Sequence, residues 1–435
     1  MNGVSVALDE TAREVSERQV LPAEGLRETI EQQRPITALC LTILLLNACN
    51  RPICMDRASL RASSLGHRRA TNFGIGAHQR RNRSTVRKSG RLAPPVDGLP
   101  GVVYPAVEGR NELRIRSSRR VATKVMRSDG HAFAPSGEQV QLYYDDQRAV
   151  AVEVGGALRS YIASGRELLD GYELTERCTG ARGQSLIPWP NRLRDGCYEF
   201  AGERYQLSLS EPANHNAIHG LVRWANWTVA DRSEHRAVMA HVLHPQDGWP
   251  FALDLRIEYV LGDGGLTVNT TATNLGPGAC PYGAGAHPYL ALDTDKIDLL
   301  VLQAPGQRYL RNDDRAIPIG EEPVDGTRFD FLSPRQIGAT ELDTGYTDLR
   351  RDRDGVARVH LSTPGGERRV TLWQDETYPF LMLFTGDSLR QPERRRRGLG
   401  VEPMTCAPNA MRSGDGLRKL GPGESLTTGW GISPR

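Results

Sequence analysis

The C-terminal two thirds of the chain consists of short apolar runs separated by turns rich in Gly, Asp, Asn and Pro. Two pairs of runs meet at tight turns, at Ala201-Gly202 and at Gly262 to Gly265, and each pair predicts a β-hairpin. The runs predicted as strands cover residues 141–145, 149–155, 158–163, 197–209, 227–232, 237–243, 255–275, 299–303, 357–362, 368–375 and 380–386. Long amphipathic helical patterns are missing. The sequence therefore predicts an all-β fold, a large antiparallel β-sandwich of about 300 residues.

Residues 1–133 show no sustained periodicity. They pass from an acidic segment through a short apolar run to an arginine-rich stretch, a composition that buries too little apolar surface to offset the entropy of ordering. We expect an N-terminal extension over 1–133 that is basic and disordered, and a β-sandwich domain over 134–435. A gene start further downstream is an equivalent interpretation, and a nucleic-acid or membrane arm is a less favoured one.

The charge is unevenly distributed. Residues 51–127 contain 18 Lys and Arg against 4 Asp and Glu, and the rest of the chain contains 37 against 48. The formal net charge of +3 therefore describes neither part. It gives no evidence that the main domain binds nucleic acid, and we expect no nucleic-acid partner.

The spacing of the cysteines and one apolar segment near the N-terminus indicate the cellular location of the protein. No C-x-x-C pair occurs, and the four cysteines of the main domain are widely spaced, so neither a zinc site nor a disulfide scaffold is indicated. The run Ile36 to Cys49 is shorter than the roughly 20 residues that a membrane-spanning helix needs, and it follows an acidic flank that does not suit a signal peptide. The chain is thus expected to be cytoplasmic, without a membrane partner. Export as a lipoprotein is a less favoured alternative, because LNAC resembles a lipoprotein cleavage box in which Asn47 fits poorly.

Four separated stretches carry polar side chains that a bare strand would not need. They are IPWPNRLRDGCYEF, NHNAIHGLVRW, GAHPYL and LGVEPMTCAPNAM, and they present Asn191, Arg192, Asn214, His215, His219, His287, Tyr289, Glu402 and Asn409. No G-x-G-x-x-G or P-loop opens a helix, so no nucleotide cofactor is expected.

Each of these residues also has a simpler interpretation. Arg192 could be a surface charge beside Asp195, and His219 could be a loop histidine bonded to a backbone carbonyl. Glu402 differs because Gly400-Val401 and Pro403-Met404 flank it, and a carboxylate is costly to bury without a partner. A His and a Glu in apolar loops suggest an acid and a base with tuned pKa values.

In this order the motifs resemble the aldose 1-epimerase (galactose mutarotase) family, from about Pro135 to Ile432. The resemblance rests on five motifs in register and on the ending LRKLGPGESLTTGWGI. The motifs are PWPNR with the following G.Y.F.G..Y.L pattern, AIHGL, AHPYL, LDTGYTDL and VEPMTCAPNA. It implies a galactose mutarotase-like β-sandwich with an open sugar-binding cleft.

The resemblance also implies roles for individual residues. His287 would be the general acid and Glu402 the general base. Five further residues would contact substrate, the last two matched only by adjacency within motifs: Arg192, His219, Asp343, Asn191 and Tyr289. Two parts depart from the family pattern, namely residues 1–133 and the basic, insertion-like stretch 388–400 before Glu402.

The implied reaction is mutarotation of a hexose, glucose or galactose. A base takes the proton of the anomeric hydroxyl while an acid protonates the ring oxygen, and the aldehyde turns before the ring closes on its other face. This chemistry needs no metal and no cofactor, and its partner is a small-molecule aldose. Trp189, Tyr289 or Trp373 would supply an apolar face for the ring. The protein is expected to be a monomer or a homodimer.

Three other functions stay open. A glycoside hydrolase would use two carboxylates, for which Asp343 and Glu402 are available, but the histidines are then unexplained. A hexose-6-phosphate 1-epimerase would need basic residues at the cleft. Arg194 or the run Arg394 to Arg397 could provide them, although the run is more typical of a solvated loop. A non-catalytic carbohydrate-binding protein would not require the His287 and Glu402 pair.

Overall fold

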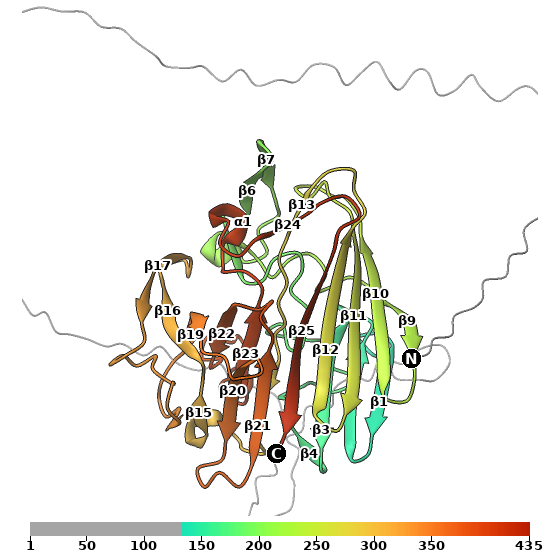
Figure 1. Ribbon diagram of the computed structural model, residues 1–435. Coiled ribbons are helices and arrows are strands. Elements are labelled where there is room, and N and C mark those ends of the chain that lie inside the picture. Colours follow the sequence, from blue (N-terminus) through green and yellow to red (C-terminus); the bar gives the residue numbers. More distant parts are fainter. Residues whose placement is uncertain (1–132) are drawn as a thin grey trace, which may run out of the picture. The chain divides into compact units, whose positions relative to one another are not determined.

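The computed structural model describes residues 133–435. The predicted extension, the apolar run 36–49 and the arginine-rich stretch 51–127 lie outside the described residues. Within residues 133–435 the chain forms antiparallel sheets and one short α-helix, as the apolar pattern predicted (Figure 1). Among these residues no helix combines the length and the apolar character needed to cross a bilayer.

The largest sheet has nine strands, and its long members β10, β11, β12 and β25 lie side by side in Figure 1. In spatial order it contains β18 (Arg335–Gln336), β15 (Val301–Gln303), β20 (Ala357–Ser362), β21 (Arg369–Gln374), β25 (Ser425–Pro434), β12 (Gly265–Asn274), β11 (Leu253–Gly262), β10 (Arg236–Leu243) and β9 (Thr228–Arg232). The hairpin predicted at Gly262 to Gly265 is confirmed, because β11 and β12 pair up to that turn.

The second sheet has six strands and carries the candidate site. Its spatial order is β14 (Tyr289–Leu290), β23 (Leu399–Met404), β22 (Phe380–Phe384), β19 (Asp343–Leu349), β16 (Gly306–Asn312) and β17 (Pro318–Pro323). Strands β16, β19, β22 and β23 lie to the left of the long strands in Figure 1.

Smaller elements complete the domain. A four-stranded sheet contains β1 (Gln139–Tyr144), β2 (Gln147–Val152), β3 (Ala157–Ala163) and β4 (Arg166–Glu167). Three two-stranded sheets pair β5 (Arg192–Arg194) with β8 (Asn216–Ile218), β6 (Cys197–Phe200) with β7 (Glu203–Gln206), and β13 (Cys280–Tyr282) with β24 (Arg418–Leu420). The β6–β7 pair confirms the hairpin predicted at Ala201-Gly202. The helical elements are η1 (Pro212–Asn214), η2 (Ile297–Leu299), η3 (Pro392–Arg394) and α1 (Ala410–Ser413).

The burial pattern shows how the sheets pack. Along β11 and β12 buried residues alternate with more exposed ones, so one face of this sheet is packed and the other faces outward. Apolar side chains from both large sheets, for example Ile257 of β11 and Leu383 of β22, belong to one continuous core. The described chain is therefore a β-sandwich. Its four described cysteines are free and buried, as expected from their spacing.

The eleven predicted runs all fall on strands, but twelve of the strands in residues 133–435 were not predicted. Seven of these have only two or three residues, and the five longer ones are β16, β17, β19, β23 and β25. The omission of β23 matters most. All six of its residues are buried, so it shows no alternation, and Gly400 and Pro403 are more typical of loops. Glu402 was expected in an apolar loop. That expectation was wrong, because Glu402 lies inside β23.

Candidate active site

A cavity of about 360 Å³ opens on one face of the six-stranded sheet. This volume is within the range of small-molecule sites, roughly 300–1,000 Å³. All seven residues predicted for the site line it, together with loops 177–181, 210–213 and 388–391: Asn191, Arg192, His219, His287, Tyr289, Asp343 and Glu402. We call this cavity the cleft.

The register of the sheet explains why residues so distant in sequence meet. Tyr289 pairs with Gly400, Gly400 with Phe384, and Phe384 with Asp343, and residues directly opposite in a sheet point to the same face. These four residues form one row across β14, β23, β22 and β19. His287 lies two residues before Tyr289, and Glu402 lies two residues after Gly400. The antiparallel pairing of β14 with β23 therefore brings His287 next to Glu402.

His287 and Glu402 are in direct contact. His287 Nε2 lies 3.2 Å from Glu402 Oε1, and the two side chains are only 5% and 2% exposed. Neither group is fully satisfied: within residues 133–435, His287 Nδ1 and Glu402 Oε2 have no hydrogen-bond partner. A buried polar atom without a partner is costly, and these two belong to residues that line the cleft, where a ligand can bond to them.

Burial shifts both pKa values toward the neutral forms. It raises the pKa of Glu402 well above its usual 4.5, and the carboxylate of Asp343 adds to the rise while Arg192 opposes it. Burial also lowers the pKa of His287 to about 3, and the guanidinium groups of Arg182 and Arg223 add to this effect. The pair thus shares one proton. In the substrate-free site the two pKa shifts place this proton on Glu402 rather than on His287.

Tyr289 holds the His287 ring in place. The two rings stack at a centroid distance of 4.9 Å and an interplanar angle of 12°. The Tyr289 hydroxyl donates to the Gly180 carbonyl over 2.8 Å, and the Arg182 guanidinium lies over the Tyr289 ring, 4.5 Å from its centroid. Tyr289 was predicted as a substrate contact. Its hydroxyl is engaged with Gly180, so its clearest contribution is to orient the imidazole.

His219 faces the same cleft in a defined tautomer. The Asn191 backbone N–H donates to His219 Nδ1 over 3.2 Å, so in the neutral ring the proton sits on Nε2. Burial lowers the pKa of His219 well below 6.5, with Arg223 and His287 adding to the shift, so the ring is neutral at physiological pH. His219 Nε2–H is therefore a hydrogen-bond donor. Asn191 positions this ring and also Arg192, whose N–H donates to the Asn191 side-chain oxygen over 2.9 Å.

Arg192 is held between two carboxylates. Its Nε donates to Glu211 over 3.1 Å, and a terminal nitrogen donates to Asp343 over 3.3 Å. These partners keep the pKa of Arg192 above its ordinary value even though burial opposes the charge. The alternative that Arg192 is a surface charge beside Asp195 is wrong, because Asp195 bonds to other residues.

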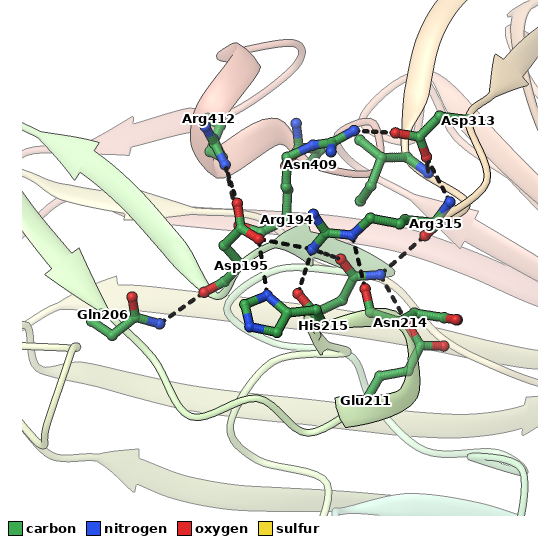
Figure 2. Close-up of polar contacts among 12 residues, drawn as sticks. Arg194, Asp195, Gln206, Glu211, Asn214, His215, Asp313, Arg315, Asn409 and Arg412 are labelled. Carbon is green, nitrogen blue, oxygen red and sulfur yellow. Dashed lines mark hydrogen bonds and ion pairs between the residues drawn. The ribbon is translucent and has the colours of Figure 1, made fainter.

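A polar network fixes the strand that carries Arg192 (Figure 2). Asp195 accepts from Arg315 over 2.9 Å and contacts His215 Nδ1 at 3.0 Å and Arg412 at 3.3 Å. Arg194 pairs with Asp313. Asn409 bonds to both ends of β5: its N–H donates to the Arg192 carbonyl over 2.7 Å, and its side-chain oxygen accepts from the Arg194 N–H over 3.1 Å. We call this set the Asp195 network.

Several residues that the sequence suggested for substrate binding lie outside the cleft. Trp189 is buried in the core and Trp373 lies on β21 of the other sheet, so neither lines the cleft. Arg194 belongs to the Asp195 network. The run Arg394 to Arg397 is only partly solvated: Arg395 and Arg397 are exposed, whereas Arg394 pairs with Asp170 and Glu176 and Arg396 pairs with Asp298 and Asp387. None of these residues lines the cleft.

Other cleft residues were not predicted. Glu211, Arg223, Trp224 and Phe384 line the cleft, as do Arg177 and Arg390. Arg223 and Trp224 are the last two residues of the stretch NHNAIHGLVRW, so the sequence did contain a signal for them. Glu211, Arg177 and Arg390 lie in polar loops, where nothing local distinguishes them from surface residues.

One set of side chains has the composition of a metal site. Ligand atoms of His219, His287 and Glu402 lie within 4.8 Å of one another, and two imidazoles with one carboxylate can bind a transition metal. The same three groups can also donate and accept protons directly. A chelator distinguishes these two uses.

Comparisons with known proteins agree with this architecture. The sequence model of a family described as aldose 1-epimerase matches residues 139–433. A protein of Escherichia coli K12, described as uncharacterized protein YihR, is 32% identical over 290 residues, which cover 66% of this chain and 91% of that protein.

Solved structures resemble the fold. A GalM/aldose epimerase homologue from C. elegans has a TM-score of 0.62 at 17% identity, covering 68% of this chain and 98% of that one. A galactose 1-epimerase from Lactobacillus acidophilus NCFM has a TM-score of 0.58 at 19% identity, with coverage of 72% and 98%.

Proposed function

The chain belongs to the aldose 1-epimerase family, and from this premise we propose that its cleft interconverts the α and β anomers of a hexose such as glucose or galactose. The observation that carries the proposal is the contact of 3.2 Å between His287 Nε2 and Glu402 Oε1 on the cleft wall. Mutarotation moves protons at two oxygens bonded to the same carbon, the anomeric hydroxyl and the ring oxygen. Two proton-transferring groups side by side suit that requirement.

The proposed steps balance in protons and electrons. Glu402 takes the proton of the anomeric hydroxyl while His287 gives a proton to the ring oxygen, and the bond between C1 and the ring oxygen breaks as the C1 carbonyl forms. The open aldehyde turns about its C1–C2 bond. Ring closure reverses the transfers: His287 takes the proton back from the hydroxyl on C5, Glu402 returns one to the carbonyl oxygen, and the ring closes on the other face.

The shared proton explains how one pair serves both directions. Ring opening needs a Glu402 carboxylate and a His287 imidazolium, whereas ring closure starts from a protonated Glu402 and a neutral His287. These two forms contain the same number of protons and differ by one transfer across the 3.2 Å contact. The pKa shifts favour the neutral form, which is the form that closes the ring.

The remaining cleft residues would hold the sugar hydroxyls. His219 offers a donor at Nε2, Arg192 offers guanidinium N–H groups and Asp343 offers a carboxylate acceptor. Buried hydroxyls need such partners, and a mixed set of donors and acceptors suits hydroxyls, which both donate and accept. The exposed ring of Trp224 would offer an aromatic surface to the sugar, in place of Trp189 and Trp373, which do not line the cleft.

The competing functions are less well supported. The nearest partner of Glu402 is a histidine, whereas a glycoside hydrolase would use a second carboxylate, and Asp343 is instead paired with Arg192. A sugar-binding protein without turnover would gain nothing from two buried, incompletely bonded titratable groups. We also propose a cytoplasmic location, which the four buried free thiols of residues 133–435 support, and a monomeric or homodimeric state.

Polarimetry on freshly dissolved α-D-glucose and α-D-galactose tests the proposal. We expect the purified protein to accelerate the change in optical rotation of at least one sugar, and to do so equally in the presence of EDTA. A rate equal to the spontaneous one for both sugars would contradict the proposal. Loss of activity in EDTA, restored by a divalent metal, would show that His219, His287 and Glu402 act as metal ligands.

A further inference from the structure

Three arginines line the cleft without a carboxylate partner. They are Arg177, Arg223 and Arg390, and within residues 133–435 no Asp or Glu oxygen lies within ion-pair distance of any of them. Most other arginines near the cleft are paired, including Arg192 with Glu211 and Asp343, and Arg182 with Asp170. The free charge of the cleft is therefore positive, and it comes from these three side chains.

Arg223 is the most informative of the three. It is half-buried, yet its guanidinium makes only one long hydrogen bond, 3.5 Å to the Ile218 carbonyl. It lies close enough to His219 and His287 to lower the pKa of both imidazoles. A partly desolvated cation without a counter-charge is costly, so its retention beside the histidines points to a negatively charged ligand group.

Arg177 and Trp224 extend this region toward the cleft mouth. The Arg177 guanidinium lies over the Trp224 ring, 5.7 Å from its centroid, and this contact orients the arginine although the indole is 53% exposed. Arg390 comes from a third segment. Its neighbour Leu389 packs so closely on Gly180 that a Cβ there would lie 2.8 Å from a Leu389 methyl group. Three separate loops thus bring positive charge to one cleft.

The charges are arranged unevenly around the catalytic pair. Arg192 and Asp343 are paired with each other beside Glu402. Arg223 follows His219 in the same loop, and the His219 ring centroid lies 5.3 Å from that of His287, so Arg223 belongs to the segment that contacts His287. In the proposed mechanism Glu402 serves the anomeric hydroxyl and His287 serves the ring oxygen. The ring oxygen is bonded to C5, which carries C6, so a substituent on C6 lies on the His287 side of the cleft, where Arg223 is.

We propose that the cleft contains an anion subsite formed by Arg177, Arg223 and Arg390, and that the preferred substrate is a pyranose with a negatively charged group at C6, such as a carboxylate or a phosphate. This inference rests on the proposed mutarotase function. The sequence suggested Arg194 and the run Arg394 to Arg397 for a phosphate, but none of these residues lines the cleft, so they are not part of this subsite.

The test compares charged and neutral sugars of matched shape. Anomer exchange catalysed by the full chain is measured by NMR for D-glucuronate against D-glucuronamide, and for D-glucose 6-phosphate against D-glucose, after subtraction of each spontaneous rate. We expect kcat/KM for at least one charged sugar to exceed that of its neutral counterpart about tenfold or more, which is the scale of one charge-assisted hydrogen bond. The preference should shrink at high ionic strength, because the cleft mouth is solvated.

Two variants test the residues. Arg223→Gln should lower the ratio of charged to neutral kcat/KM about tenfold or more, and Arg177→Glu should lower it as well. Because Arg177 is exposed, the second variant keeps the test valid if Arg223→Gln does not fold. Arg353→Gln is the matched control: Arg353 is exposed, lies outside the cleft and should leave the ratio unchanged.

The outcomes separate the possible failures. Preference for glucuronate identifies a carboxylate as the anion, preference for glucose 6-phosphate identifies a phosphate, and preference for both shows a subsite for either. Equal turnover of charged and neutral sugars, or a preference that both arginine variants retain, overturns the anion subsite while the mutarotase function stands. If none of the four sugars exchanges faster than spontaneously, the mutarotase function is wrong and the subsite falls with it.

Discussion

The His287–Glu402 pair and the Asp195 network are both clusters of ionisable side chains, but they differ in how completely their polar atoms are bonded. Asp195 is 40% exposed and bonds to His215, Arg315 and Arg412. His287 and Glu402 are almost fully buried, and each retains a polar atom without a partner in the described part of the chain. A saturated, solvated network fixes the positions of loops, whereas a buried and unsaturated pair is available for chemistry.

Strand β5 connects the two clusters. Arg192 reaches the cleft, Leu193 is buried in the core, and Arg194 pairs with Asp313 in the network. The network therefore supports the site through the backbone of β5. Variants in the two clusters should therefore affect different properties. Substitutions in the cleft should lower turnover, whereas substitutions in the network should cause a modest loss of stability.

The largest effect is expected for His287→Asn. Asparagine retains a hydrogen-bonding group but has no titratable proton, so ring opening loses its acid and ring closure loses its base. We expect kcat for mutarotation to fall by at least ~10²-fold, the low end of what a positioned acid or base contributes. Polarimetry at saturating sugar measures this, and circular dichroism checks the fold. A rate within a few-fold of wild type would remove His287 from the mechanism.

Arg192→Ala and Arg194→Ala form a matched pair on one strand. Loss of Arg192 should lower kcat/KM about 10- to 100-fold, mainly through weaker sugar binding, because a charge-assisted hydrogen bond to substrate is lost. Arg194→Ala should leave kcat/KM unchanged, since its partner Asp313 lies outside the cleft. Steady-state kinetics on both variants provides the comparison. Equal losses in the two would mean that β5 acts as a structural unit and that Arg192 has no direct role.

The pH profile distinguishes a coupled pair from two independent groups. With ordinary pKa values, a Glu base and a His acid would coexist only between about 4.5 and 6.5, and the rate would fall about tenfold per unit above that window. Burial lowers the pKa of His287 to about 3 and raises that of Glu402. The pair should therefore retain its single proton, and kcat/KM should stay within about threefold from pH 5.5 to 7.5. A bell-shaped profile centred below pH 6 would contradict this.

The smallest effect is expected for Asp195→Asn. The amide still accepts hydrogen bonds but loses its charge, so the free energy of unfolding should fall by at most about 1 kcal/mol, as for other exposed ion pairs. Urea denaturation measures the stability, and polarimetry should show a rate within about twofold of wild type. A folded variant with a tenfold slower rate would show that the network contributes to catalysis through β5.

The sequence predicted the long, half-exposed strands well, because β11 and β12 alternate in burial and end at glycine turns. It failed for β23, because burial on both faces removes the alternation of buried and exposed residues and because Gly400 and Pro403 are more typical of loops. The contact between His287 and Glu402 depends on how β14 pairs with β23, which no local pattern contains. The residue pattern suggested an acid and a base formed by a His and a Glu, and the resemblance to a family assigned these roles to His287 and Glu402.

Charged residues were the least predictable part of the site. The run Arg394 to Arg397 has the composition of a solvated loop, yet Arg394 and Arg396 meet carboxylates from distant segments, such as Asp170 and Asp298. By contrast, Arg223 stands beside a recognised motif and was overlooked because its isolation from carboxylates is a tertiary property. Which arginines are paired and which are free can be known only from the fold.

Turnover by Glu402→Gln tests the central claim most directly. The amide keeps the shape of the side chain and its reach to a hydroxyl, but it cannot accept a proton at neutral pH. NMR exchange at saturating sugar should show kcat reduced by at least ~10²-fold, while calorimetry on the same sample shows sugar affinity close to that of wild type. An unchanged exchange rate in a folded, sugar-binding Glu402→Gln protein would contradict the account, because the cleft would then catalyse mutarotation without its proposed base.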